Sequence, residues 1–227
     1  MNRLVSTNRD EIIQAIARGM DRALESKLKV LWLLSGGSNI AIELEVIARL
    51  EHAMSQNLRV SMIDERFVPE GDPDSNWGQL KRRGLSAKRA TLVPPIVDFN
   101  VTLDEAAADF AKRLNESVAW ADVVIGQFGI GADGHTAGIL PGSVGVNERE
   151  KLVIGYEGPD YKRLTTTPAF FDCIDLAICV ALGKNKVPVI ERMPSDISAS
   201  DQPAQLLLKT KECIIYTDQP ATWPAES

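Results

Sequence analysis

Hydrophobic positions along the chain follow two alternating periods. The segment 10–26 has apolar residues at intervals of four, which places them on one face of a helix: Ile12, Ile16, Met20 and Leu24. The next segment, 28–37 (LKVLWLLSGG), is a short continuous apolar run that stops at glycines, as buried strands do. The pattern therefore predicts a helix followed by a buried strand.

The same two patterns repeat to the end of the chain. Further helices are predicted over 40–54, 102–119, 186–193 and 203–210, and further strands over 58–64, 121–129, 175–182 and 212–218. Strands that are apolar on both faces and separated by helices are typical of a parallel sheet covered on both sides. We therefore expect an α/β fold of one domain spanning residues 1–227, with a mainly parallel, doubly wound sheet and helices on both faces.

Composition adds the broad class of protein to this fold. The 227 residues are 44% hydrophobic and 25% charged, which is enough apolar material for a substantial core. Residues 1–20 interleave charges with apolar residues, unlike a signal peptide, and no apolar run approaches the length that crosses a membrane. We expect a cytoplasmic protein without a membrane partner, acting as a monomer or a small homo-oligomer.

Charge and cysteine content exclude two kinds of site. The net charge of −6 argues against a nucleic-acid surface, which needs clustered cations, so an anionic ligand must be held by a local group of donors. Cys173, Cys179 and Cys213 are odd in number and lack C-x-x-C spacing. We expect buried, reduced thiols rather than a disulfide or a zinc site, and no metal site.

Unusual residues gather where the predicted strands end. Four such stretches follow strands: SGGS (35–38), DERFVPEGDPDSN (64–76), GIGADGHTAG (129–138) and LGKNK (182–186). In open parallel sheets, ligands bind beyond the carboxyl ends of the strands. We therefore look for the chemistry of this protein in these four stretches.

The stretch GIGADGHTAGILPG (129–142) contains the G-x-G-x-x-G pattern of dinucleotide-binding loops. Pro141 and Gly142 leave room for only about two helical turns after it, which is short for that role. The alternative is a tight glycine loop, including Gly131, that exposes amide groups and presents His135. An imidazole, with an ordinary pKa of about 6.5, suits proton transfer near neutral pH.

The role of Asp133, two residues before His135, stays open, and the second histidine of the chain is a separate case. Asp133 either orients the imidazole or caps a short helix that follows the loop. The other histidine of the chain, His52, lies among polar residues of a predicted helix, and we expect it at the surface.

The SGGS stretch (35–38) could hold an anionic ligand. The SGGS turn joins a buried strand to a helix, where the amides of Ser35, Gly36, Gly37 and Ser38 could meet an anion. It lacks the G-K-[ST] ending of a P-loop, and no G-x-S-x-G nucleophile elbow exists in the chain. The alternative is a plain turn with Ser38 as the helix cap.

The DER stretch carries three adjacent charges. Arg66 could supply several planar donors, and Asp64 could accept from substrate hydroxyls. The alternative is a solvated loop held by its own ion pairs, with Ser75 and Asn76 capping the next helix. Arg163 and Lys186, if they face the SGGS turn, would complete a phosphate site.

Taken in order, SGGS, DERFVP with DSN, GIGADGHTAGILPG, KRLTTTP and LGKNK resemble the 6-phosphogluconolactonases. The resemblance implies the α/β fold shared with glucosamine-6-phosphate deaminases, a small sugar-phosphate substrate, and no metal or organic cofactor. It implies that His135 activates a water and that Arg66 lies over the lactone. It also implies a phosphate grip made by Ser38, the Gly36 and Gly37 amides, Arg163 and Lys186, with Lys184 outside the matching position.

The sequence departs from these lactonases at two places that border the expected pocket. Gly138 and Ile139 stand where serine and phenylalanine are usual, and Asn39-Ile40 stands where Thr-Pro is common, which leaves the substrate preference open. A deaminase is the nearest alternative, but deaminases carry D-E-Y and a glutamate after the histidine loop, and TAGILPGS has no carboxylate. A non-catalytic sugar-phosphate sensor would need a DNA-binding module, for which we find no basic segment.

Overall fold

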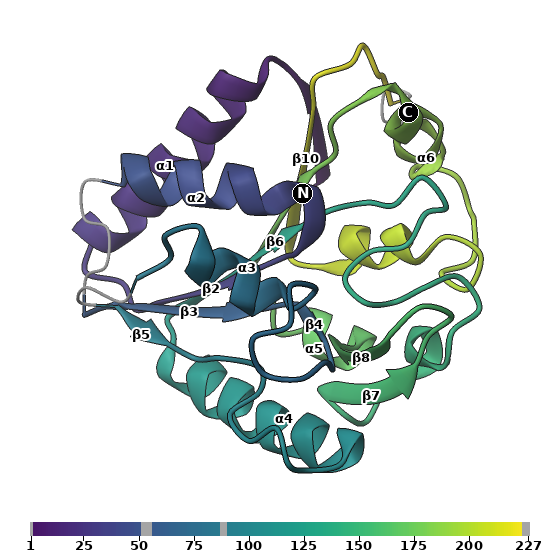
Figure 1. Cartoon of the computed structure of the whole chain (residues 1–227). Helices are drawn as coiled ribbons and strands as arrows, with labels where there is room; N and C mark the ends of the chain where they lie inside the picture. The colour runs from purple at the N-terminus through teal and green to yellow at the C-terminus, as the bar shows by residue number, and fades with distance from the viewer. Residues whose placement is uncertain (1, 51–55, 87–89, 224–227) are drawn as a thin grey trace.

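A seven-stranded sheet organises the computed structural model, which describes residues 2–50, 56–86 and 90–223 (Figure 1). Every pair of neighbouring strands in this sheet is parallel. The order across the sheet is β1 (Asn2–Ser6), β10 (Glu212–Thr217), β9 (Leu176–Val180), β6 (Val123–Phe128), β2 (Val30–Leu34), β3 (Leu58–Met62) and β5 (Thr91–Leu92). The expected parallel sheet is confirmed, with two short strands, β1 and β5, that the apolar pattern did not indicate.

Helices cover both faces of the sheet, as expected for a doubly wound fold. One face packs against α1 (Arg9–Glu25), α2 (Ile40–Arg49) and α3 (Asn76–Arg82). The other packs against α4 (Leu103–Trp120), α5 (Pro168–Phe171) and α6 (Val187–Arg192). Four short 3-10 helices complete the described elements: η1 (Gly37–Asn39), η2 (Val144–Asn147), η3 (Lys184–Lys186) and η4 (Pro203–Lys209).

Strand β2 shows why its sequence is apolar throughout. Successive side chains of a strand point to opposite faces, so Trp32 joins the cluster under α1 and α2 while Leu31 and Leu33 join the cluster on the other face. All five residues of β2 are buried. A strand with no polar face belongs in the centre of a sheet covered on both sides.

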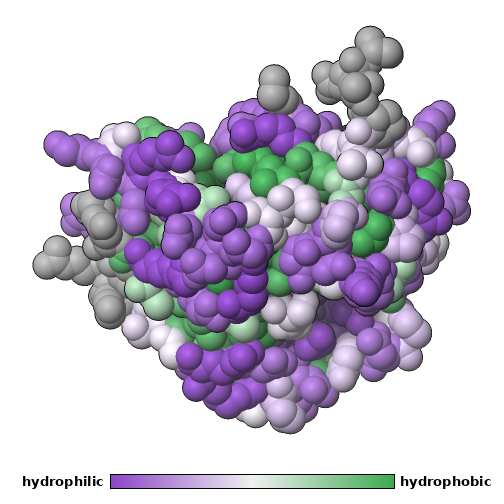
Figure 2. Space-filling view, turned by 90° about the horizontal axis from the view of Figure 1, so that it is seen from above, coloured by the Kyte–Doolittle hydropathy of each residue, from purple (hydrophilic) through white to green (hydrophobic). Residues whose placement is uncertain are grey.

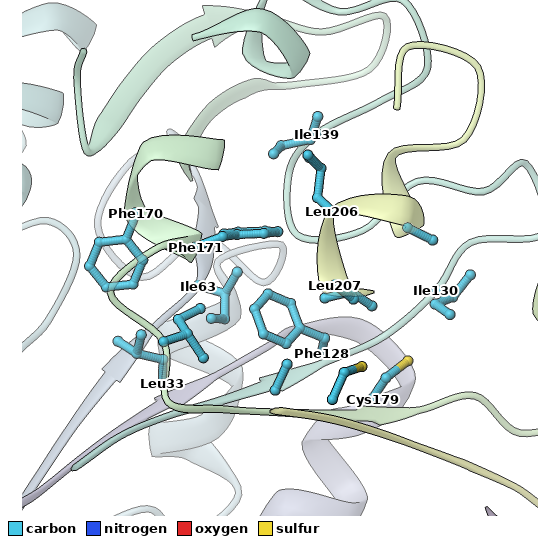
Figure 3. Close-up of a cluster of buried hydrophobic side chains, with 14 of the residues drawn as sticks. Leu33, Ile63, Phe128, Ile130, Ile139, Phe170, Phe171, Cys179, Leu206 and Leu207 are labelled. Atoms are coloured by element: carbon cyan, nitrogen blue, oxygen red, sulfur yellow. The ribbon is translucent and has the colours of Figure 1, made fainter. Parts of the chain in front are cut away.

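The core on the α4 face is built around aromatic residues at the end of β6 (Figure 3). The Phe128 ring meets Phe171 of α5 edge to face, with ring centres 5.2 Å apart. Leu206 and Leu207 of η4 pack into the same cluster. This packing fixes the end of β6, from which the histidine loop departs.

A second sheet has three antiparallel strands, in the order β4 (Asp64–Arg66), β8 (Lys162–Thr166) and β7 (Val153–Glu157). The chain crosses from the main sheet at Ile63, whose N–H donates to the Leu34 carbonyl and whose carbonyl accepts from the Thr166 N–H. The prediction of a loop from residue 64 is therefore wrong for its first three residues.

The observed caps and ends of the helices match the predictions only in part. Ser75 caps α3 by accepting from the Gly78 N–H, whereas Asn76, also expected as a cap, is the first helical residue and is buried. The predicted helix over 203–210 is the 3-10 helix η4. The helix predicted over 40–54 ends at Arg49, and His52 lies outside the described residues.

Hydrophilic side chains cover most of the face shown in Figure 2, with hydrophobic residues showing between them. Across the described ranges, the large exposed hydrophobic residues are Val97, Phe99 and Val144. No helix in these ranges is both long and apolar enough to cross a membrane. The cysteines are free thiols, buried at Cys179 and Cys213 and partly exposed at Cys173, so the expectation of burial is wrong for Cys173.

The order of the strands reverses direction between β2 and β6. From β2 the chain continues to β3 on one side, and from β6 it continues to β9 on the other side. Loops leaving the carboxyl ends of β2 and β6 therefore diverge and leave a crevice between them. This is the point at which a ligand is expected in such a sheet.

We predict that Phe128→Ala lowers the free energy of unfolding by about 3–5 kcal/mol, because it leaves a cavity in the core at the end of β6. Chemical denaturation measures the change. Val144→Ala is the control, since Val144 is 68% exposed and its loss should cost less than about 0.5 kcal/mol. Equal effects of the two substitutions would contradict the packing described here.

Candidate active site

A cleft lies over the carboxyl ends of the central strands, where the sheet order reverses. Its walls come from the loop after β2, the strand β4, the loop after β6, the strand β8 and η3. The lining residues are 35–39, Asp64, Arg66, Asn76, 129–131, His135, Ala137, Arg163 and Lys186. The four stretches at the predicted strand ends therefore meet in one place, together with β8.

His135 is held at the edge of this cleft by Asp133. The Asp133 carboxylate lies 2.7 Å from Nδ1 of the imidazole and accepts from the His135 backbone N–H at 3.1 Å. Asp133 itself lies behind the histidine and does not line the cleft. The next helix, η2, begins at Val144 after Ser143, so the capping alternative for Asp133 is wrong. A 3-10 helix of four residues is also not the helix that a dinucleotide site would need.

The loop is tight because Gly131 lies against the histidine side chain. A Cβ atom on Gly131 would lie 2.1 Å from His135 Nδ1, too close for any other residue to fit without rearrangement. The Gly131 N–H donates to the His135 carbonyl at 2.8 Å, which closes the loop. The glycine spacing therefore serves to fold the backbone around His135.

Electrostatics keep Asp133 ionised. Burial alone would raise the pKa of Asp133, but its hydrogen bonds with the backbone N–H and imidazole of His135 outweigh burial, and the pKa lies below its usual value. In the neutral imidazole whose Nδ1–H donates to this carboxylate, the other ring nitrogen carries a lone pair. The side chain is 41% exposed, so water reaches it.

The SGGS turn forms the opposite wall. It opens η1 and α2, and neither helix has a side-chain cap, so the alternative of Ser38 as a cap is wrong. The first N–H groups of a helix lack intrahelical acceptors and favour an anion. Gly36 is packed against Asn76, because a Cβ on Gly36 would lie 2.2 Å from the Asn76 side chain.

Strand β4 divides the three adjacent charges between two faces. Asp64 and Arg66 line the cleft, whereas Glu65 points away and accepts from the N–H groups that begin α3, at 2.7 and 2.8 Å. Burial raises the pKa of Glu65 to about 7, against the effect of these hydrogen bonds. Burial also raises the pKa of Asp64, and the charges of Arg66 and Arg163 oppose it.

Three cations face the cleft: Arg66, Arg163 and Lys186. The antiparallel register of β4 and β8 sets Arg66 directly opposite Arg163. The Tyr161 ring lies near both guanidinium groups, 5.4 Å from that of Arg66 and 5.8 Å from that of Arg163. Lys184 is not among the lining residues.

Each arginine also has a fixed partner in the protein. One nitrogen of Arg163 donates to both carboxylate oxygens of Asp160, at 2.7 and 2.8 Å, and its side chain is only 11% exposed. Arg66 donates to the Asp74 carbonyl at 2.8 Å. These contacts orient the two guanidinium groups toward the space between the loops.

Several lining or supporting residues had no role in the sequence analysis. Asn39 and Asn76 line the cleft, and Tyr161 contacts both arginines. Asn39 drew notice only as a departure from the lactonase pattern, and Asn76 only as a helix cap. Among the residues that the structure describes, no cluster of three or more histidine, cysteine or acidic side chains could hold a metal ion.

Known proteins resemble this chain in both sequence and fold. A family model described as glucosamine-6-phosphate isomerases/6-phosphogluconolactonase matches residues 7–216. The 6-phosphogluconolactonase of Bos taurus is 31% identical over 188 residues, covering 77% of this chain and 72% of its own length. That of Xylella fastidiosa strain Temecula1 is 28% identical and covers 85% of each chain.

Solved structures extend the likeness of the fold. The crystal structure of a 6-phosphogluconolactonase from Thermotoga maritima superposes with a TM-score of 0.79, covering 96% of this chain and 98% of that one at 19% identity. At that identity the likeness concerns the fold alone. Because the family model matches nearly the whole chain, this protein belongs to the glucosamine-6-phosphate isomerase/6-phosphogluconolactonase family.

Proposed function

We propose that the protein hydrolyses 6-phospho-D-glucono-1,5-lactone to 6-phosphogluconate, a reaction of the oxidative pentose phosphate pathway. The observation that carries the proposal is the placement of His135, with Asp133 bound to its Nδ1, at the edge of a cleft that also holds three cations. The relatives from Bos taurus and Xylella fastidiosa are named 6-phosphogluconolactonases, which supports the same substrate class.

The proposed reaction needs one base and one anion-binding wall. His135 Nε2 removes a proton from a water molecule as the water oxygen attacks C1 of the lactone. The guanidinium of Arg66 stabilises the negative charge that develops on the carbonyl oxygen. When the bond between C1 and the ring oxygen breaks, the imidazolium returns its proton to the departing oxygen, so that the acid and the hydroxyl form and the enzyme is restored.

The remaining residues hold the rest of the sugar phosphate. Arg163 and Lys186 bind the 6-phosphate together with the N–H groups of Gly36, Gly37 and Ser38. Gly131 lets the backbone fold against the histidine, since its N–H donates to the His135 carbonyl. Asp64 accepts from sugar hydroxyls. Ser35 shapes the turn, since its N–H and hydroxyl are both used within the protein. Anchoring the phosphate orients C1 toward the activated water.

Hydrolysis of freshly prepared lactone, followed by coupled oxidation of the acid, tests the proposal once the spontaneous rate is subtracted. Wild-type protein should exceed that background. Ammonia release from glucosamine 6-phosphate, measured in parallel, tests the deaminase alternative. Ammonia release at a rate that matches lactone hydrolysis would overturn the proposal, and binding of the lactone without turnover would favour a sensor.

We predict that His135→Ala and His135→Asn each lower kcat by roughly 10²- to 10⁴-fold, because each removes the base that activates water. KM should change much less, since the phosphate contacts remain. Steady-state kinetics of the lactone reaction measures both constants. Wild-type kcat in either variant would exclude His135 as the base.

We predict that Asp133→Ala lowers kcat by roughly 10- to 100-fold, a smaller loss than that of His135→Ala. Without the carboxylate at Nδ1, the imidazole is free to turn and to place its proton on the nitrogen that should act as base. The same assay provides the measurement. A loss confined to KM would show that Asp133 acts on binding and not on the histidine.

We predict that Arg163→Ala and Lys186→Ala each raise KM by roughly 10-fold or more and lower kcat by less, because both bind a group remote from the reacting carbon. Lys184→Ala is the matched control, since Lys184 does not line the cleft, and it should leave KM unchanged. If Lys184→Ala raised KM as much as Lys186→Ala, the assignment of the phosphate lysine would be wrong.

A further inference from the structure

Glu43 of α2 is a charged residue in a position where the sequence pattern expects an apolar one. It lies three residues after Ile40 and three before Val46, and both of these are buried in the core cluster between α2 and the sheet. Glu43 itself is 0% exposed. Burying a carboxyl group costs free energy unless hydrogen bonds compensate for its lost hydration.

The carboxyl group of Glu43 holds the start of the SGGS turn. Its Oε1 accepts from the Ser35 backbone N–H at 2.7 Å and from the Ser35 hydroxyl at 3.2 Å. The Ser35 hydroxyl in turn accepts from Nδ2 of Asn39 at 3.1 Å. Both ends of the turn, Ser35 and Asn39, are therefore tied to one buried group.

This hydrogen-bond network also comes close to the histidine loop. Nδ2 of Asn39 lies only 2.9 Å from the position that a Cβ atom on Gly129 would occupy. Gly129 begins the loop that presents His135, and Asn39 ends the turn on the opposite wall. The network therefore lies close to the start of the histidine loop as well as holding the SGGS turn.

Burial and a nearby carboxyl group both affect the ionisation of Glu43. Burial raises the pKa of Glu43 well above its usual value, the nearby Asp64 acts in the same direction, and the two hydrogen bonds from Ser35 oppose them. The second carboxyl oxygen of Glu43, Oε2, is buried and has no hydrogen-bond partner among the described residues.

We propose that Glu43 is a positioning residue, whose hydrogen bonds to Ser35 hold the SGGS turn in the conformation that binds the substrate phosphate. The inference rests on the proposed lactonase function for its substrate, but on the contacts of Glu43 for its mechanism. It assigns a role to a residue that neither touches the cleft nor belongs to any motif.

The test compares Glu43→Leu with Glu43→Gln. Leucine fits the apolar stripe of α2 but cannot accept from Ser35, whereas glutamine keeps an acceptor oxygen in place without a charge. Glu45→Gln is the matched control, because Glu45 lies on the same helix, is partly exposed and pairs with Arg9. Thermal melting of each variant reports whether the fold is retained.

Two lactones separate positioning from general damage. For 6-phosphogluconolactone, Glu43→Leu should raise KM by roughly 5- to 20-fold, the loss of about one or two hydrogen bonds, with a smaller effect on kcat. For glucono-1,5-lactone, which has no phosphate, kcat/KM should change by less than about twofold. Glu43→Gln should lose little, and Glu45→Gln should match wild type. A wild-type KM in Glu43→Leu, an equal loss with both lactones, or equal damage by glutamine and leucine would each overturn the inference.

Binding of inorganic phosphate, measured by calorimetry, keeps the inference separate from the proposed reaction. We expect the Kd of Glu43→Leu for inorganic phosphate to rise by about the same factor as its KM for the lactone. If wild type binds phosphate but hydrolyses no lactone, the proposed function fails, and the phosphate affinities of the two variants still decide the role of Glu43. If wild type and Glu43→Leu bind phosphate equally, or if wild type binds none, the role proposed for Glu43 is wrong.

Discussion

The parallel pairing of β2 with β6 is the constraint on which the cleft depends. These two strands lie side by side, with Val30 opposite Val123, yet the chain leaves them toward opposite sides of the sheet. The SGGS turn and the histidine loop therefore begin next to each other and diverge. Each strand is buried on both faces, so the hydrophobic core sets the separation of the two loops before any polar contact forms.

The second sheet adds two of the three cations that line this crevice. Its strand β4 continues directly from β3, and its register with β8 sets two arginines opposite each other. Like charges in that position repel, so an anion between them is favoured. Two contacts reduce this repulsion when no ligand is bound. The Tyr161 ring lies near both guanidinium groups, and Asp160 binds Arg163. A chain with a net charge of −6 thus concentrates positive charge at one place.

The main sheet could be predicted from the sequence because its central strands are continuous apolar runs between amphipathic helices. The second sheet could not be predicted, since β4 has three residues and carries three charges, which read as a loop. Strand β1 was missed for a related reason, because it is a partly exposed edge strand with polar residues. The glycine and charged motifs indicated which residues meet in the cleft. Glu43 carried no signal, because hydropathy alone does not show that a carboxyl group within an apolar stripe has a partner.

Some of the buried polar atoms without a hydrogen-bond partner lie at this cleft. Among the described residues they include Nε of Arg66, Nε of Arg163, Oδ1 of Asn76 and Oε2 of Glu43, the first three on lining residues and the last beneath the SGGS turn. Folding alone gains nothing from leaving such groups unpaired, because each loses its hydration. Local departures from good packing concentrate where a protein binds its ligand. Both guanidinium groups line the cleft, so an anion bound there would meet two planar sets of donors.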